Sequence, residues 1–298
     1  MNAHQPKSLI RSPAILGALF MILAGMVFAA INVLTQWLAM VLHFPASSMA
    51  FWQYAIATAF SLPLLIKLGI RAMRTRHPVR HVLRVVLAAL GVQAWAYGLV
   101  TVPIWQAIAL VMTSPFFVII GARLFLGETV GLHRWSATAI GFTGAMIILQ
   151  PWADSFSATA LLPVLAALLW GGSSLIMKNL THHEPAETVT IWLFVLLTPI
   201  NAALAFGTGF ALPQASSLWL LVLAGFLTAI GQYLLTLAYS VADAAYVQPF
   251  DDLKLPLNVL AGWVVFSYAP SGYLWLGALL ILGASLSLML KEARQQQR

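Results

Sequence analysis

The stretch AILGALFMILAGMVFAAINVLTQWLAM, residues 14–40, contains no Asp, Glu, Lys or Arg. An apolar segment of about 20 residues is long enough to cross the hydrocarbon core of a bilayer as a helix. Lys7 and Arg11 precede it, as basic residues precede the apolar part of a signal peptide, but the run is too long for one and contains Asn32 and Gln36. The sequence therefore predicts a retained transmembrane helix here.

The whole chain is similarly rich in apolar residues and poor in charged ones. Of its 298 residues, 61% are hydrophobic and only 8% are charged, whereas an average soluble chain carries about 25% charged residues. This composition excludes a soluble protein. The chain has no cysteine, which removes disulfides, thiolate metal sites and thiol nucleophiles together.

Ten apolar segments are long enough to span a membrane, and they are continuous rather than alternating, which favours helices. They cover residues 14–40, 46–66, 82–100, 104–126, 135–151, 158–179, 187–206, 217–238, 243–267 and 272–290. We expect an all-α membrane protein with ten transmembrane helices, an N-terminal tail over 1–13 and a C-terminal tail over 291–298.

The basic residues predict the orientation. If the N-terminus is cytoplasmic, fourteen of the fifteen Lys and Arg residues fall at cytoplasmic ends, and the opposite connections have none. The fourteen are Lys7, Arg11, Lys67, Arg71, Arg74, Arg76, Arg80, Arg84, Arg123, Arg134, Lys178, Lys291, Arg294 and Arg298. This positive-inside pattern places both termini in the cytoplasm. A surface for anionic lipid or nucleic acid over Lys67 to Arg84 is the less favoured explanation.

The chain also resembles itself. Residues 28–32 (FAAIN) lie 142 residues before 170–174 (WGGSS), and Tyr97 lies the same distance before Tyr239. Pro115 lies 141 residues before Pro256. We therefore expect two repeats of five helices, over 14–151 and 158–290. Because five is odd, the second repeat enters the membrane from the opposite side, which is typical of secondary transporters with a site between their halves.

Several motifs carry a family resemblance. They are the aromatic or small residues before Gly, Ser or Asn in helices one and six, the Ala-Tyr ends of helices three and eight, Pro115, Leu126-Gly127-Glu128, Gln248 to Pro256 and Ala261-Gly262-Trp263. Together they resemble the EamA-type members of the drug/metabolite transporter superfamily over essentially the full length. Phe266-Ser267-Tyr268 departs from the pattern, because a second Gly-Glu is missing there. The resemblance implies a ten-helix carrier of the bacterial inner membrane with a central cavity and alternating access. Amino-acid and aromatic amino-acid exporters of this superfamily have the same size and layout.

The ninth span contains the only charges far from a helix end. Asp251, Asp252 and Lys254 lie between Pro249 and Pro256, at a depth where an unpaired charge costs roughly 2.5–3.5 kcal/mol. Asp251 and Lys254 are three residues apart and can pair, whereas Asp252 points away from Lys254. Two explanations stay open: these residues contact substrate or carry a proton, or they form a buried pair that locks a broken helix.

Polar and aromatic side chains on other spans predict an uncharged, aromatic-rich cavity, with hydrogen bonding between helices as the alternative. The candidate cavity residues are Asn32, Gln36, Gln93, Tyr97, Trp105, Gln106, Trp170, Ser173, Ser174, Met177, Gln232, Tyr239, Gln248 and Asn258. Rings at Trp105 and Trp170 would suit an aromatic or apolar side chain of a substrate.

Enzyme functions find little support. His77 and His81 have zinc-like spacing but lie in a basic connection without nearby carboxylate or cysteine ligands. There is no phosphate-binding loop, and adjacent residues such as Asp251 and Asp252 diverge on a helix, so they cannot form an aspartyl dyad.

The sequence predicts a secondary transporter, not an enzyme, that exports small metabolites, above all amino acids including aromatic ones. The alternatives are a carrier of a larger metabolite such as a vitamin or nucleoside derivative, and a membrane-embedded enzyme. We expect a monomer that contacts a small-molecule substrate and the lipid bilayer, with no nucleic acid partner, no cofactor and no metal.

Overall fold

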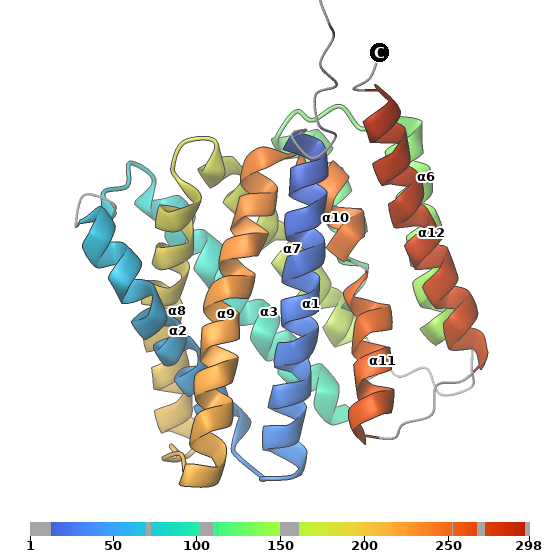
Figure 1. The fold of residues 1–298 in the computed structure, drawn as a ribbon. Coiled ribbons are helices and arrows are strands. Elements are labelled where there is room, and N and C mark those ends of the chain that lie inside the picture. The colour runs from blue at the N-terminus through green and yellow to red at the C-terminus, as the bar shows by residue number, and fades with distance from the viewer. Residues whose placement is uncertain are drawn as a thin grey trace, which may run out of the picture.

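The structure, a computed structural model, describes residues 13–69, 73–101, 110–111, 113–149, 161–251, 253–266 and 272–295. These residues form a bundle of α-helices with short connections and no strand in the part of the chain described (Figure 1). The helices are α1 (Pro13–Met40), α2 (Ala46–Leu68), α3 (Pro78–Thr101), α5 (Ser114–Phe125), α6 (Leu132–Leu149), α7 (Leu161–Thr181), α8 (Ala186–Thr208), α9 (Ala215–Val241), α10 (Ala244–Asp251), α11 (Lys254–Phe266) and α12 (Gly272–Gln295).

Each of the ten predicted spans contains at least one of these helices. By length and composition, α1, α2, α7, α8 and α9 are apolar enough to cross a membrane, while α5 and part of α12 are shorter apolar helices. The prediction of an all-α, multi-pass membrane protein is therefore confirmed. The start of α1 and the end of α12 lie at the same end of the bundle (Figure 1), and the cytoplasmic placement of that end stays a prediction.

Two prolines flank the break in the ninth predicted span, whereas Pro63 and Pro199 lie inside the continuous helices α2 and α8. The ninth predicted span is two helices, α10 and α11, with Pro249 inside the first and Pro256 in the first turn of the second. Proline lacks an amide N–H and its ring crowds the preceding turn, so it is tolerated only at a helix start or where a helix bends. Pro115 occupies the start of α5 in the same way.

The helix contacts follow the two-repeat pattern. Helix α1 packs along α9, and its counterpart α7 packs along α3. Likewise, α10 and α11 of the second half contact α1 of the first, and α5 of the first half contacts α7 of the second. The pairs α2–α8 and α6–α12 join equivalent helices of the two halves. Exchanging the halves thus reproduces these main helix pairs, as expected for two repeats that face each other across a pseudo-two-fold axis.

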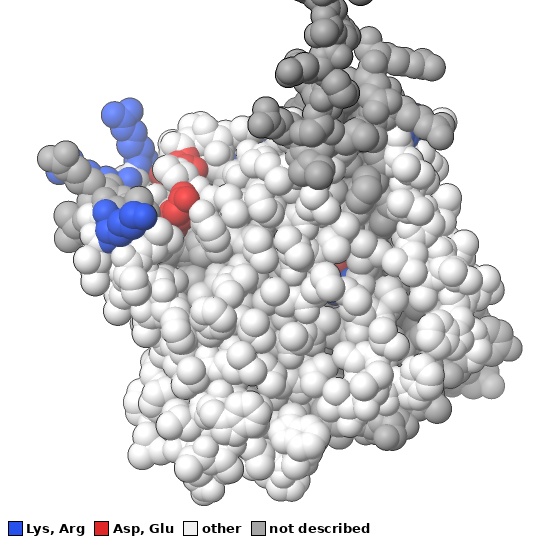
Figure 2. All heavy atoms as spheres, in the orientation of Figure 1, with Lys and Arg blue, Asp and Glu red and all other residues white. Residues whose placement is uncertain are grey.

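The surface fits a bilayer. Figure 2 shows that most of the charged atoms in view gather at one end of the bundle, beside the α2–α3 and α7–α8 connections, with a small charged spot at mid-height and an otherwise largely uncharged surface. Large apolar side chains such as Ile66, Phe125 and Val264 are more than 70% exposed. Such a wide apolar surface would be a liability in water but is suited to lipid contact.

A buried lysine and a half-buried glutamate stabilise the connection between α9 and α10. The ammonium of Lys178 donates hydrogen bonds to the carbonyl oxygens of Tyr239 and Ala242, at 2.9 and 2.7 Å. The carboxylate of Glu128, from the Leu-Gly-Glu motif, accepts from the first two amide N–H groups of α10 at 3.0 and 3.1 Å. A cation at a helix C-terminus and an anion at an N-terminus both match the helix dipole.

Candidate substrate-binding cavity

A cavity of about 340 Å³ lies between the two halves. Nine helices contribute to its wall, from α1 and α2 in the first half to α10 and α11 in the second. The predicted residues that line it are Asn32, Trp170, Ser173, Ser174, Met177, Gln232, Tyr239, Gln248, Asp251, Lys254 and Asn258. Repeat-related positions meet here, since Phe28 and Trp170 both line the cavity, as do Asn32 and Ser174.

Some predicted cavity residues lie elsewhere. Gln36 and Gln93 are half-buried and do not line the cavity. Gln36 lies one turn beyond Asn32 along α1, and Gln93 is rotated about 100° from Val92, which faces the cavity. Three other candidates, Trp105, Gln106 and Asp252, and the side chain of Tyr97, lie outside what the structure describes.

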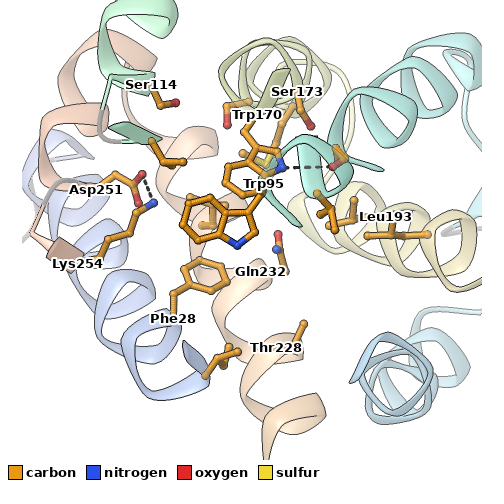
Figure 3. Close-up of a pocket in the computed structure, with 18 of the residues that line it drawn as sticks. Phe28, Trp95, Ser114, Trp170, Ser173, Leu193, Thr228, Gln232, Asp251 and Lys254 are labelled. Carbon is orange, nitrogen blue, oxygen red and sulfur yellow. Dashed lines mark hydrogen bonds and ion pairs between the residues drawn. The ribbon is translucent and has the colours of Figure 1, made fainter. Parts of the chain in front are cut away.

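Aromatic rings form one side of the cavity. The ring centroids of Trp95 and Trp170 are 6.1 Å apart with planes tilted by 47°, and Phe28 points toward Trp95 from α1 (Figure 3). The Trp170 indole N–H donates to the carbonyl oxygen of Ala88 at 3.2 Å, which fixes the ring against α3. A planar ligand can therefore find flat apolar surface here without disturbing the tryptophans' own contacts.

Amide side chains and a charge pair form another part of the wall. The Asn32 amide donates to the Asn258 side-chain oxygen at 2.9 Å, which joins α1 to α11. The Lys254 ammonium donates to the Asp251 carboxylate at 2.6 Å, between the last residue of α10 and the first of α11 (Figure 3). The predicted pairing is thus present and bridges the helix break. The hydroxyl of Tyr239 also donates to the side-chain oxygen of Gln248.

Several lining residues were not among the predicted cavity residues, namely Phe28, Gln53, Tyr54, Arg84, Trp95 and Ser114. Arg84, Ala88, Val92 and Trp95 follow helical spacing, so one face of α3 could have been recognised as a unit. Gln53 was a further signal, because it is polar within an apolar span. Its amide donates to the hydroxyl of Thr228 at 2.7 Å.

Arg84 is buried, which the sequence did not predict. It lies near the start of α3, is only 3% exposed and lines the cavity, while its predicted position at a cytoplasmic helix end stays a prediction. Its guanidinium donates to the carbonyl oxygen of Val189 at 2.9 Å and to the sulfur of Met177 at 3.1 Å. Arg84 also falls within the predicted span over residues 82–100, so its position in the sequence was compatible with a place inside the membrane.

The cavity combines aromatic surface with a few hydrogen-bonding groups, as small-molecule sites do. In the described part of the chain, no three His, Asp or Glu side chains lie together as metal ligands would. A central cavity between two repeats of membrane helices defines a carrier of small molecules. The chain belongs to the EamA-like transporter family, which matches residues 15–150 and 157–290.

Two transporters and one solved structure are similar to this chain over most of its length. The chain is 67% identical to a riboflavin transporter of Rhizobium johnstonii over 96% of this chain and 95% of that protein. It is 51% identical to a riboflavin transporter of Brucella anthropi over 92% and 98%. A solved crystal structure superposes with a TM-score of 0.75 at 18% identity, covering 96% of this chain and 99% of the other, which shows a shared fold.

These comparisons overturn one prediction. Amino-acid transport and export do not agree with relatives of such high identity that are riboflavin transporters. Aromatic rings and amides in a cavity suit an aromatic amino acid and a larger aromatic metabolite alike, so the residue types did not discriminate between them. The coarser prediction stands: the protein is a multi-pass transporter of the inner membrane for a small metabolite.

Proposed function

We propose that this protein carries riboflavin across the inner membrane. The observation that carries the proposal is the 67% identity to a riboflavin transporter over nearly the whole of both chains. Relatives so similar share almost all of their helix contacts, and the cavity is built from those helices.

The cavity chemistry supports the proposal. Riboflavin has a flat three-ring system with an apolar dimethylbenzene end, a polar dione end and a chain of hydroxyl groups. Trp95, Trp170 and Phe28 offer aromatic surface for the rings. The amides of Gln232 and Gln248 offer donors and acceptors for the polar groups. A cavity of about 340 Å³ also falls in the range of about 300–1,000 Å³ usual for sites that bind drug-sized molecules.

Transport would proceed by alternating access of the two halves around this cavity. The Asp251–Lys254 pair and the Asn32–Asn258 bond both lie at the boundary of α1, α10 and α11. We propose that the Asn32–Asn258 bond, which joins the two halves, holds one closed arrangement of them, while the Asp251–Lys254 pair steadies the break between α10 and α11. The remaining polar cavity residues would contact the substrate.

Growth of a bacterial riboflavin auxotroph tests the proposal. Cells expressing the protein should grow at riboflavin concentrations too low for cells with the empty vector. Trp170→Ala removes a ring from the cavity and should abolish the advantage. Trp219→Ala is the matched control, because Trp219 is 60% exposed on α9 and outside the cavity. Equal growth with and without the protein, at comparable expression, would refute the proposed substrate.

A further inference from the structure

Arg84 is a buried cation in the second turn of α3. Its side chain is 3% exposed, and it contributes to the cavity wall from α3. Moving a charge out of water is costly unless partners replace the lost hydration. A buried arginine in a membrane helix therefore marks a functional site by default.

The described partners of Arg84 leave most of its hydrogen-bonding capacity unused. A guanidinium has five N–H donors, and the structure gives the side chain two acceptors, a backbone carbonyl and a weakly accepting thioether. Neither partner carries a charge. The guanidinium therefore has N–H groups left to donate to a ligand in the cavity.

The carboxylates of the described residues are engaged elsewhere. Asp251 binds Lys254, Glu184 binds His81, and Asp243 binds Arg134. Glu128 accepts from the start of α10, and Glu187 accepts from a tyrosine hydroxyl of α9. Since Lys254 is neutralised by its pair, Arg84 supplies the cavity's unbalanced charge within this described set.

Helix α7 holds Arg84 and the aromatic surface at a set spacing. Ser173 donates its hydroxyl to the Arg84 carbonyl at 3.1 Å, and Met177 accepts from the guanidinium. Trp170 lies on the same helix, seven residues before Met177, which corresponds to about 10 Å along the axis. A fused three-ring system is long enough to bridge this interval.

We infer that Arg84 binds the acceptor edge of the flavin ring, the dione end with its carbonyl oxygens and neighbouring ring nitrogens, while Trp95 and Trp170 contact the apolar end. This inference rests on the proposed function. The planar guanidinium presents parallel N–H groups to two adjacent acceptors, an arrangement that a lysine ammonium cannot reproduce. Arg84 is then the residue that distinguishes a flavin from other flat aromatic molecules.

Binding to purified protein in lipid nanodiscs tests the inference with three probes. Riboflavin has the ring and the hydroxyl chain, lumiflavin has the ring alone, and acridine has three fused rings without carbonyl groups. The variants are Arg84→Met, Arg84→Lys and the control Arg80→Met. Arg80 is exposed one turn earlier on α3, and its guanidinium donates to the side-chain oxygen of Asn179.

Arg84→Met should weaken the binding of riboflavin and of lumiflavin by the same factor, about 10- to 100-fold, as expected for the loss of hydrogen bonds from a charged group. Arg84→Lys should also weaken both, since it keeps the charge but loses the fork. Acridine should bind the wild type and both variants alike, and Arg80→Met should match the wild type with every probe.

Three results would overturn the inference. Unchanged lumiflavin binding with weakened riboflavin binding would place Arg84 at the hydroxyl chain. An equal loss for acridine would assign Arg84 a purely structural role. Wild-type protein that binds acridine as tightly as lumiflavin would refute edge recognition without any variant, even if the substitutions prevent folding. If the wild type binds no flavin at all, the proposed function itself fails.

Discussion

Trp170 lies against Gly91 so closely that a Cβ atom at position 91 would be 2.5 Å from the indole ring. The repeat-related contact is present between α1 and α9, where Phe28 lies against Gly231 and a Cβ atom would be 3.3 Å from the ring. In each half, an aromatic residue of the cavity is seated on a glycine of the helix that packs against its own. The cavity rings are therefore positioned by two equivalent close helix contacts.

Gly91→Ala should displace the Trp170 ring, since contacts as short as 2.5 Å force a neighbour to move. Overpacking of this kind costs about 1–3 kcal/mol of stability, and we expect flavin binding to weaken roughly tenfold. Fluorescence titration of the purified variant measures this effect. Gly283→Ala is the control, because no atom lies within 4 Å of its added Cβ. Equal affinities for the two variants would contradict this positioning role.

Lys178→Met should loosen the connection between α9 and α10. The substitution keeps an unbranched apolar chain one atom shorter than lysine, and it removes the two hydrogen bonds that Lys178 donates to the carbonyl oxygens of Tyr239 and Ala242. Loss of such bonds in a buried position costs about 1–3 kcal/mol, which a lowered midpoint of thermal unfolding in nanodiscs will report. Lys67→Met changes an exposed lysine and should leave the midpoint nearly unchanged. A midpoint for Lys178→Met equal to that of the wild type would be the contrary result.

The Asp251–Lys254 pair can be assigned a structural or a functional role by a double substitution. Asp251→Asn alone leaves a half-buried ammonium without its partner, and Lys254→Met alone does the same to the carboxylate. Each should lower the amount of folded protein, because an unpaired charge is expensive in this setting. Combining them should restore folding, since neither member of the pair then leaves an unpaired charge behind. We expect the folded double variant to retain transport, so a folded but inactive protein would instead indicate direct contact with substrate or proton.

The predicted orientation can be measured directly, since the natural sequence contains no cysteine. Ala46→Cys and Arg76→Cys introduce single thiols at exposed positions on opposite ends of the bundle. A membrane-impermeant maleimide added to intact spheroplasts should label Ala46→Cys and spare Arg76→Cys until the cells are opened. The reverse pattern would show that both termini lie outside the cytoplasm.

The fold was predictable because its determinants are local and strong. Apolar runs such as 14–40 have one low-energy structure in a bilayer, the α-helix. Pro249 and Pro256 predict the break between α10 and α11. Much of the cavity was predictable for a related reason. Side chains such as Asn32 and Gln248 are too polar for lipid, so they had to face the interior.

The cavity residues that were not predicted, and the substrate, depend on packing between helices, which a single sequence does not encode locally. A tryptophan in an apolar helix is equally acceptable in lipid and in a cavity, so Trp95 carried no signal by itself. An arginine near a helix end is explained equally well by the cytoplasmic surface, which concealed the buried position of Arg84. The substrate was missed because aromatic surface and amides are common to the sites of many flat metabolites.

Riboflavin counterflow in liposomes containing the purified protein tests the central claim most directly. Liposomes preloaded with unlabelled riboflavin should accumulate radiolabelled riboflavin transiently, whereas protein-free liposomes and liposomes with the Trp170→Ala variant should not. The same liposomes preloaded with phenylalanine or tryptophan should give no such accumulation. Counterflow with the amino acids and none with riboflavin would contradict the account.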